Sequence, residues 1–473
     1  MVFSSNLFLF AFLPLTLLLY FILPKNLATK NIRNSVLLVL SLVFYSWGEL
    51  HYLWLLLLSI TANYFFGIAI GKKQSKRAKD FIIFAAVAVN LVLLGYFKYA
   101  NFLFENLNQF FLTQIANEKI HLPIGISFFT FHAISYLIDI YRGKCRAQKN
   151  IFDLALYISF FPQLIAGPIV RYNAIEKYLG ERRHSFYAAA QGIRRFIIGL
   201  GKKIIIANPL GEFADAVFTS PILDLNPAIA WAGLAAYSLQ IYFDFSGYSD
   251  MAVGLARIFG FKFPENFNYP YISRSIKEFW RRWHMSLSAW FRDYVYIALG
   301  GNRVSLARQY FNLVLVFFLC GLWHGASWNF VIWGMFHGFF LVFERVRIGK
   351  AFLNFLPSFA QHFYAIFVIM IGWVFFRSPN LTHAIAFLKM MFVGSRSGWG
   401  FNVVAQTAQS HFVWMAAVLA FLGVSPMLKN LVARWQKNKV FAAGFDGFLI
   451  LVFIFAIVRL SAATHNPFIY FQF

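Results

Sequence analysis

The sequence carries little of the charge that a soluble protein of its length needs to cover its surface. Only 13% of its 473 residues are charged, roughly half the share that is usual in soluble domains. Hydrophobic residues make up 60% of the chain and aromatic residues 20%, including 61 Phe. Apolar segments of membrane-spanning length follow one another, with short charged clusters between them. The composition therefore excludes a soluble protein and predicts a polytopic membrane protein.

Cysteine is also scarce, and the histidines lack the spacing of metal ligands. Cys145 lies in a predicted cytoplasmic cluster and Cys320 within a predicted span, so the two cannot pair and a disulfide framework is excluded. His324 and His337 are separated by roughly 220° around a helix, so they do not form a metal-binding pair. We therefore expect no metal site.

Acidic residues are few, with 18 Asp and Glu against 42 Lys and Arg and a net charge of +24. Such an excess could indicate nucleic acid, but the basic residues fall at the ends of hydrophobic segments, where they act as topology signals. We therefore expect no nucleic-acid partner. Basic residues follow the first apolar segment and none precedes it, which predicts an uncleaved anchor and an extracytoplasmic N-terminus. With this orientation, the basic clusters at 72–79 and 142–149 both fall on the cytoplasmic side of the membrane. The C-terminus is expected outside the cytoplasm as well.

The apolar segments predict an all-α polytopic integral membrane protein with about twelve membrane segments. Some segments are candidates for re-entrant elements, such as the one near 193–207, which carries several basic residues. We expect a single integral domain over 1–473. Within it, 1–150 would form N-terminal helical hairpins, 151–345 the core, and 346–473 the C-terminal spans and an extracytoplasmic tail.

Three apolar stretches are interrupted by Pro, Gly or acidic residues, at 122–127, 161–168 and 243–250. Broken backbone at membrane depth is tolerated only where protein or a water-filled cavity surrounds it. These stretches therefore predict a thin core of short tilted helices with funnels, which either an enzyme or a transporter could contain. Asp244 and Asp250 are core candidates, and each is equally plausible as a structural hydrogen-bond acceptor.

The segment 273–294 is too charged to span a membrane and too aromatic to be fully solvated. At helical spacing its large apolar side chains share one face, which predicts an amphipathic helix in the membrane interface. The arginines are first candidates for lipid headgroup anchors. Arg281 and Arg282, beside Trp283, are also candidates for binding the phosphates of a nucleotide thioester, because guanidinium groups bind phosphate through paired donors.

His324 lies in an apolar and aromatic run, Gly321-Leu322-Trp323-His324-Gly325-Ala326-Ser327-Trp328. Titratable groups at membrane depth are costly and usually functional. A buried structural imidazole is an equally good interpretation from the residues alone. Trp323 and Trp328 are expected to exclude water around His324, and an imidazole can take a proton from a hydroxyl. For His284, on the interfacial segment, a structural role is the first expectation.

Three motifs in succession carry a resemblance to a known family: 242–250 (YFDFSGYSD), 279–287 (FWRRWHMSL) and 321–325 (GLWHG). Together they resemble the membrane-bound O-acyltransferase family, and most closely its bacterial branch of alginate O-acetylation and peptidoglycan O-acetyltransferase membrane subunits. The resemblance implies a ring of helices around a thin core with opposed funnels and a tunnel, with 151–345 as the catalytic core.

The resemblance also implies roles for two histidines. The catalytic histidine of the family falls on His324, which would remove the proton of the acceptor hydroxyl, and the second marked position falls on His284, which would orient substrate. Asp244, Asp250 or Asp293 could orient an imidazole, and the sequence does not choose among them.

The donor and the partners are likewise implied by the resemblance. The donor would be acetyl-CoA or an acyl carrier thioester, with no permanently bound cofactor. An extracytoplasmic SGNH-type acetyltransferase or esterase partner would decorate a polysaccharide such as alginate, peptidoglycan or another exopolysaccharide. The chain itself would lie among the lipids of the bacterial inner membrane.

The uncharged tail 466–473 is rich in aromatic residues and is expected outside the cytoplasm. Its rings could settle at the bilayer interface. Alternatively, the tail could fold back and place the hydroxyl of Tyr470 near His324 as a transient acyl carrier.

Two other classes of protein remain open from the residues. One is a transporter in which the histidines and buried acids form a proton relay, although no inverted repeat is visible. The other is a scaffold without catalysis, which would leave His324 unexplained. Thioester turnover that depends on His324 would distinguish the enzyme from both.

Overall fold

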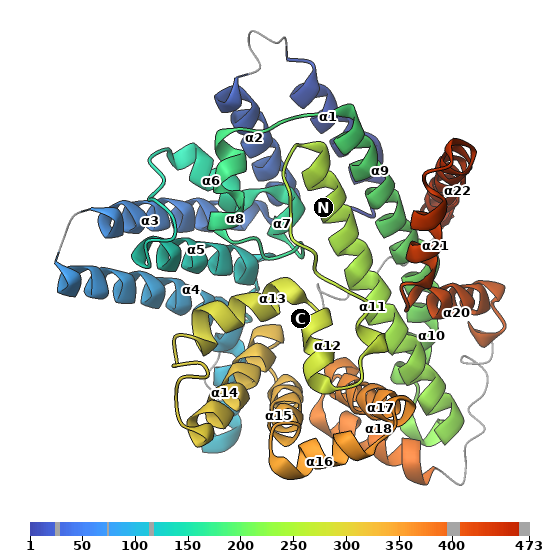
Figure 1. Cartoon of the computed structure of the whole chain (residues 1–473). Coiled ribbons are helices and arrows are strands. Elements are labelled where there is room, and N and C mark those ends of the chain that lie inside the picture. The colour runs from blue at the N-terminus through green and yellow to red at the C-terminus, as the bar shows by residue number, and fades with distance from the viewer. Residues whose placement is uncertain (24–28, 73–74, 113–117, 395–406, 463–473) are drawn as a thin grey trace. The chain divides into compact units, whose positions relative to one another are not determined.

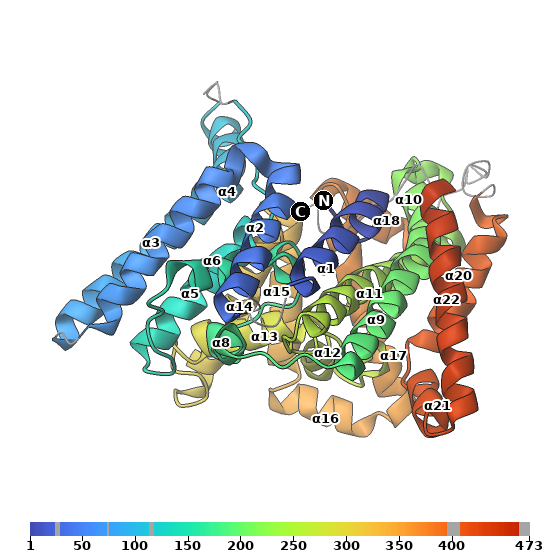
Figure 2. The same cartoon turned by 90° about the horizontal axis from the view of Figure 1, so that it is seen from above.

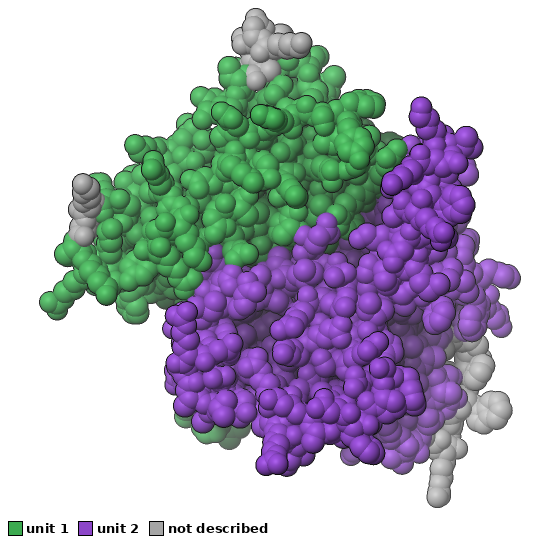
Figure 3. All heavy atoms as spheres, viewed as in Figure 1, with its two compact units in different colours: residues 1–196, 249–264 green, residues 197–248, 265–473 purple. Residues whose placement is uncertain are grey.

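A computed structural model of the chain describes residues 1–23, 29–72, 75–112, 118–394 and 407–462, and all regular secondary structure in these ranges is helical (Figure 1). These residues form two compact units, which are 1–196 with 249–264, and 197–248 with 265–473 (Figure 3). The division falls within two helices, α9 (Phe186–Gly201) and α11 (Pro227–Ile258).

The first unit is built from N-terminal helices that pack in neighbouring sets. α3 and α4 lie alongside each other and both contact α5 (Figures 1 and 2), while α2 packs on α6. The elements of this unit are η1 (Phe8–Phe12), α1 (Leu13–Phe21), α2 (Lys30–Glu49), η2 (Leu50–Tyr52), α3 (Leu53–Gly71), α4 (Lys76–Phe111), α5 (Ile126–Tyr141), α6 (Ile151–Ser159), α7 (Phe161–Leu164) and α8 (Tyr172–Gly180).

The second unit is organised around a hairpin of α14 and α15, against which α17 packs. α12 contacts both α15 and α17. Its elements are η3 (Lys202–Ala207), α10 (Asn208–Thr219), η4 (Ile222–Asp224), η5 (Pro270–Ile272), α12 (Ile276–Arg282), α13 (Met285–Trp290), η6 (Phe291–Tyr296), α14 (Leu306–His324), α15 (Trp328–Phe343), α16 (Arg347–Phe355), α17 (Ser358–Arg377), α18 (Leu381–Val393), α20 (His411–Gly423), α21 (Met427–Trp435) and α22 (Lys439–Ala462).

Within the described ranges, five helical stretches are long and apolar enough to cross a membrane, or six if the bent pair α20 and α21 counts as one span. The five are 30–71, 76–111, 306–324, 358–377 and 439–462, and four shorter apolar helices accompany them. α4 shows the physical reason clearly, because large apolar side chains such as Phe81 and Phe84 are more than 70% exposed and need lipid around them. The all-helical membrane character is thus confirmed, whereas the predicted count of about twelve segments is not.

Hydroxyl side chains begin several of the long helices. Thr29, Ser75 and Ser305 precede α2, α4 and α14, and each accepts a hydrogen bond from the backbone N–H three residues further on. Each hydroxyl therefore satisfies one of the donors that the first helical turn leaves unpaired.

Two of the three predicted backbone breaks are confirmed. The stretch 122–127 reaches α5 through Gly125, whose φ of 79° suits glycine, and 161–168 holds only the short helix α7. The break expected at 243–250 is wrong, because α11 runs through it without interruption. Gly247 serves close packing instead, since a Cβ there would lie 2.7 Å from the carbonyl oxygen of Gly199.

The α14–α15 hairpin also depends on glycine. A Cβ on Gly334 would overlap the carbonyl oxygen of Phe317 and lie 3.3 Å from the Cα of Gly321. The two backbones therefore approach more closely than any side chain at these positions would permit.

We predict that Gly334→Ala destabilises the protein, because one added methyl group must push the two helices apart at a cost of roughly 1–3 kcal/mol. Thermal unfolding of the purified protein in detergent should show a lower midpoint. Gly447→Ala in α22 is the matched control, since a Cβ there meets nothing within 4 Å and alanine favours a helix. Equal midpoints for the two variants would contradict the packing argument.

Candidate functional site

A small cavity in the second unit lies against the imidazole of His324. Side chains from α11, the end of α12, α14, α15 and α17 line it, and it has room for about one water molecule. The other lining residues are Ile241, Phe245, Trp283, Trp333, Trp373 and Phe376. Because hydrocarbon and aromatic rings form nearly the whole wall, a polar group in this cavity meets little water.

His324 is the last residue of α14 and is only 6% exposed. Its ring centre lies 4.9 Å from that of Trp323 and 5.0 Å from those of Trp333 and Phe376, each at a steep angle. Such edge-to-face contacts fix the plane of an aromatic ring. The imidazole is therefore held in one orientation at the cavity wall.

The chain leaves His324 through Gly325, which is extended and leads into α15. A Cβ at position 325 would overlap the ring of Phe330. The glycine after the histidine thus lets the turn close tightly enough for the Phe330 side of α15 to pack beside His324, at 6.5 Å between ring centres.

His284 lies at a break between two short helices. The predicted continuous helix over 273–294 is wrong, because α12 ends at Arg282, α13 begins at Met285, and His284 between them has a φ of 42°. This left-handed conformation is strained for a residue with a side chain, and such strain is often found at functional sites. His284 is 1% exposed.

The amide of Asn266 orients His284. Its Oδ1 lies 3.1 Å from Nδ1 of His284 and also accepts hydrogen bonds from the backbone N–H of Ser286 at 3.1 Å and its hydroxyl at 2.9 Å. An acceptor at Nδ1 assigns the proton there and leaves Nε2 as the basic nitrogen. Burial lowers the pKa of His284 to about 3, so the ring is neutral near pH 7.

One layer of aromatic rings connects the surroundings of the two histidines. The ring of Phe245, which lines the cavity, lies 4.7 Å from His284, and Trp323 lies 6.1 Å from His284 and 4.9 Å from His324. The two positions that the sequence singled out thus belong to one buried cluster in the second unit.

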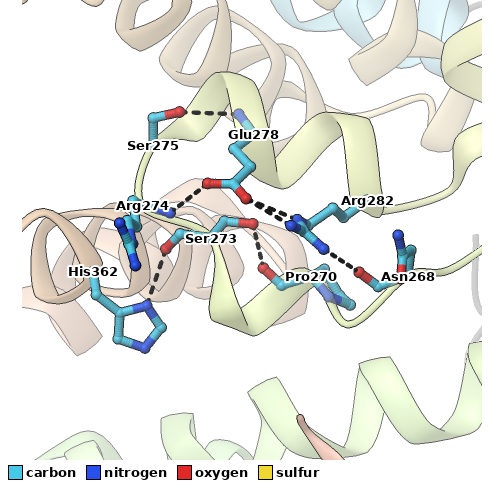
Figure 4. A network of polar contacts seen from close by, with 8 residues as sticks. All are labelled: Asn268, Pro270, Ser273, Arg274, Ser275, Glu278, Arg282 and His362. Atoms are coloured by element: carbon cyan, nitrogen blue, oxygen red, sulfur yellow. Dashed lines mark hydrogen bonds and ion pairs between the residues drawn. The ribbon is translucent and has the colours of Figure 1, made fainter. Parts of the chain in front are cut away.

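A network around the start of α12 holds this break in place (Figure 4). Ser275 accepts the backbone N–H of Glu278 at 3.0 Å, and the Glu278 carboxylate accepts the backbone N–H of Arg274 at 2.9 Å, a reciprocal cap. The same carboxylate pairs with Arg282 at 2.8 Å, and Arg282 also donates to the carbonyl of Asn268 at 3.1 Å.

The three predicted donor-binding residues have different surroundings. Arg281 is exposed, Arg282 is engaged with Glu278 as described, and Trp283 turns inward to line the cavity with His324. Trp283 stacks on Phe279, with ring centres 5.4 Å apart.

The acidic core candidates are ion-paired. Asp244 lies 2.7 Å from Nζ of Lys203, with both side chains 2% exposed, and Asp250 lies 2.7 Å from Arg195 in the first unit. Asp293 contacts Arg292 at 2.7 Å.

Of the two tryptophans expected around His324, Trp323 is buried beside it and Trp328 is 55% exposed and is not part of the cavity wall. Tyr470 lies outside the described residues.

The sequence reasoning missed Asn266 and most of the cavity wall. Asn266 carried no distinct signal, because it lies in a mixed segment beside Glu265 and close to a second amide, Asn268. Trp333, Trp373 and Phe376 carried no signal beyond being aromatic in an aromatic chain.

Comparison with known proteins shows what the chain resembles. The model of the membrane-bound O-acyltransferase family matches residues 42–416. A probable alginate O-acetylase of Azotobacter vinelandii is 40% identical, with 100% of each chain covered, and one of Pseudomonas aeruginosa is 46% identical over 83% of this chain and 75% of the relative. The peptidoglycan O-acetyltransferase of Helicobacter pylori is 34% identical over 100% of this chain and 98% of its own. These findings favour an enzyme over the transporter and the scaffold.

We predict that Asn266→Ala lowers both stability and acyl transfer. Three donors lose their shared acceptor, at a cost of roughly 1–3 kcal/mol, and a misplaced His284 would slow transfer roughly 10- to 100-fold. Thermal unfolding and thioester turnover measure the two effects. Asn268→Ala is the control, because that residue is exposed and its hydrogen bonds to Arg282 are made by its backbone N–H and carbonyl, which alanine keeps.

A second variant separates orientation of His284 from simple loss of packing. In Asn266→Asp the carboxylate favours the imidazolium, so the pKa of His284 rises from about 3. Activity should then fall on acidification at a higher pH than in the parent. A pH–rate profile identical to that of the parent would rule out a role for the ionisation state of His284.

Proposed function

Since the chain belongs to the membrane-bound O-acyltransferase family, we propose that it moves an acetyl group from a cytoplasmic thioester to an extracytoplasmic acceptor for polysaccharide O-acetylation. The single observation that supports this most is the imidazole of His324 at the wall of a dry aromatic cavity. The small size of the cavity favours a short acyl group, because a longer chain would displace more rings.

The proposed chemistry uses His324 as a general base. Its unprotonated nitrogen takes the proton of the acceptor hydroxyl while the oxygen attacks the thioester carbonyl carbon. The C–O bond forms, the C–S bond breaks, and the imidazolium returns the proton to the leaving thiolate. Acyl transfer then balances with no co-reactant beyond the thioester and the hydroxyl.

His284 would act on substrate rather than as a second base. The hydrogen bond that Nδ1 donates to Oδ1 of Asn266 leaves Nε2 of His284 as an acceptor within the same buried cluster, and the neutral ring can accept a hydrogen bond from a hydroxyl. This assignment agrees with the positioning role implied by the family motif.

The wider arrangement follows from the same proposal. A ring of helices around a thin core, with funnels from both faces, would bring the donor and the acceptor to His324. The exposed guanidinium of Arg281 is available for the phosphates of acetyl-CoA or of a carrier-bound thioester, whereas Arg282 would first have to leave Glu278.

The relatives support a polysaccharide as the final acceptor, since their names specify alginate and peptidoglycan. We infer that an SGNH-type partner outside the membrane completes the transfer. The chain would then lie in the bacterial inner membrane with both termini extracytoplasmic, which the distribution of basic residues favours.

We predict that His324→Gln reduces turnover of labelled acetyl-CoA by the purified protein roughly 100- to 10,000-fold, the range typical for loss of a general base. Glutamine keeps a hydrogen-bonding side chain of similar size. His411→Gln, at an exposed site at the start of α20, is the control. Parental turnover in His324→Gln would end the proposal.

The tail could carry the acetyl group between His324 and the partner. In this extension the Tyr470 oxygen attacks the thioester carbonyl carbon, the C–S bond breaks, and His324 moves the phenol proton to the leaving thiolate. An acceptor hydroxyl later attacks the tyrosyl ester, the bond to the phenolate breaks, and the phenolate takes up the proton that the hydroxyl loses. The Tyr470→Phe variant should then fold as the parent does but no longer transfer acetyl groups to the polymer. Mass spectrometry should detect an acetylated C-terminal peptide in the parent and none in the variant. Transfer at the parental rate would exclude the tyrosine carrier.

A further inference from the structure

A buried tyrosine in the first unit is surrounded by basic groups that the acyl-transfer chemistry does not use. Tyr20, in α1, is fully buried. The guanidinium of Arg33, in α2, lies 5.8 Å from the centre of its ring, and the imidazole of His184 lies 5.6 Å from it. The Tyr20 hydroxyl is 3.3 Å from Nε2 of His184 and is also hydrogen-bonded by Arg182. Segments far apart in the sequence therefore converge on one aromatic ring.

The two guanidinium groups lack acidic partners. Among the residues described in the first unit, neither Arg33 nor Arg182 forms an ion pair, and Nε of Arg33 is buried without a hydrogen-bond partner there. Asp153 is close enough to raise the pKa of Arg182, but among these residues it forms no ion pair with either arginine, and its carboxylate accepts a hydrogen bond of 2.7 Å from Asn34. Half-buried guanidinium groups of like charge repel each other unless an anion lies between or beside them.

Local packing holds the guanidinium group of Arg182 close enough to Arg33 for the two positive charges to repel each other. Its guanidinium lies 4.5 Å from the ring centre of Phe261 and donates to the carbonyl of Tyr178 at 3.2 Å. Gly260, with a φ of 81°, brings the loop after α11 so close that a Cβ would lie 3.3 Å from Cβ of Arg182 and 3.1 Å from the His184 ring. The arginine is thus built into the fold and is not a freely solvated surface residue.

The ionisation of the neighbouring groups is consistent with uncompensated positive charge. Burial, followed by the charges of Arg33 and Arg182, lowers the pKa of His184 to about 4. Burial also lowers the pKa of Arg182, and Arg33 adds to this effect. An anion bound at this position would oppose both shifts.

We propose that Arg33 and Arg182 form a binding site for a phosphoryl group, held through the paired N–H donors of the guanidinium groups. Two sources carry this chemistry. One is the headgroup of an anionic phospholipid, and the other is a phosphate of a nucleotide thioester. Binding at this site can be measured apart from acyl transfer, because neither arginine takes part in the proposed proton transfer at His324.

The test uses the full-length protein in a neutral detergent with two probes, short-chain phosphatidylglycerol and coenzyme A, and measures binding by native mass spectrometry or calorimetry. Arg33→Gln and Arg182→Gln should each lower the affinity for the probe that occupies the site roughly tenfold, as expected for loss of one charge-assisted contact. Arg183→Gln removes the same charge at the adjacent exposed position and should bind as the parent does.

The outcomes assign the source or end the proposal. If the two glutamine variants lose affinity for phosphatidylglycerol alone, the site binds a lipid headgroup. If they lose affinity for coenzyme A alone, it binds a nucleotide phosphate. If neither probe is weakened by the two variants, or if Arg183→Gln weakens binding equally, the proposal is wrong.

Two further measurements guard against misfolding and against confusion with catalysis. Should either glutamine variant not fold, Arg33→Lys and Arg182→Lys keep the charge but lose the planar fork, and we expect intermediate affinity. Parental affinity in both lysine variants would refute paired recognition. His324→Gln should bind the same probe normally, so a failure of acyl transfer does not affect this result.

Discussion

The close backbone contact between α14 and α15 is the constraint on which the rest of the site depends. Gly321 and Gly334 face each other across this contact, and the hairpin between them carries His324 at its turn. Had either helix a side chain there, the helices would separate and the rings of Trp333 and Phe330 would move away from the imidazole. A packing requirement of glycine thus determines the geometry of the ionisable group.

The aromatic enclosure that results has two consequences for chemistry. In the proposed reaction, exclusion of water would strengthen each polar interaction that a substrate makes with His324 and would protect a thioester from hydrolysis. The enclosure leaves room for about one water molecule, so a ring such as Phe376 or Trp283 would have to shift before an acyl group could reach the imidazole. Substrate binding would then have to supply the free energy of that movement.

The sequence predicted the helical membrane class, because composition is a local signal, and it singled out His324 as a candidate, because a polar group in an apolar run is a local signal too. It could not predict the break at His284, since two helical turns of similar composition flank it and the amide that holds it is Asn266, eighteen positions earlier. The error at 243–250 has the same origin. Gly247 can break a helix or pack against another one, and only the neighbouring Gly199 decides between these roles.

The buried and half-buried cations of this fold are of two kinds, those that pair with an acidic side chain and those that do not. Lys203 with Asp244, and Arg377 with Asp215, are pairs within the second unit, where each partner offsets the desolvation of the other. In the Lys203–Asp244 pair both side chains are only 2% exposed, so removing one member would leave a buried charge at a cost of about 3–5 kcal/mol. Arg33 and Arg182 lack such compensation within the first unit as described. In the proposed site, a bound anion would supply the charge that these two half-buried guanidinium groups do not receive from an ion pair within the described part of the first unit.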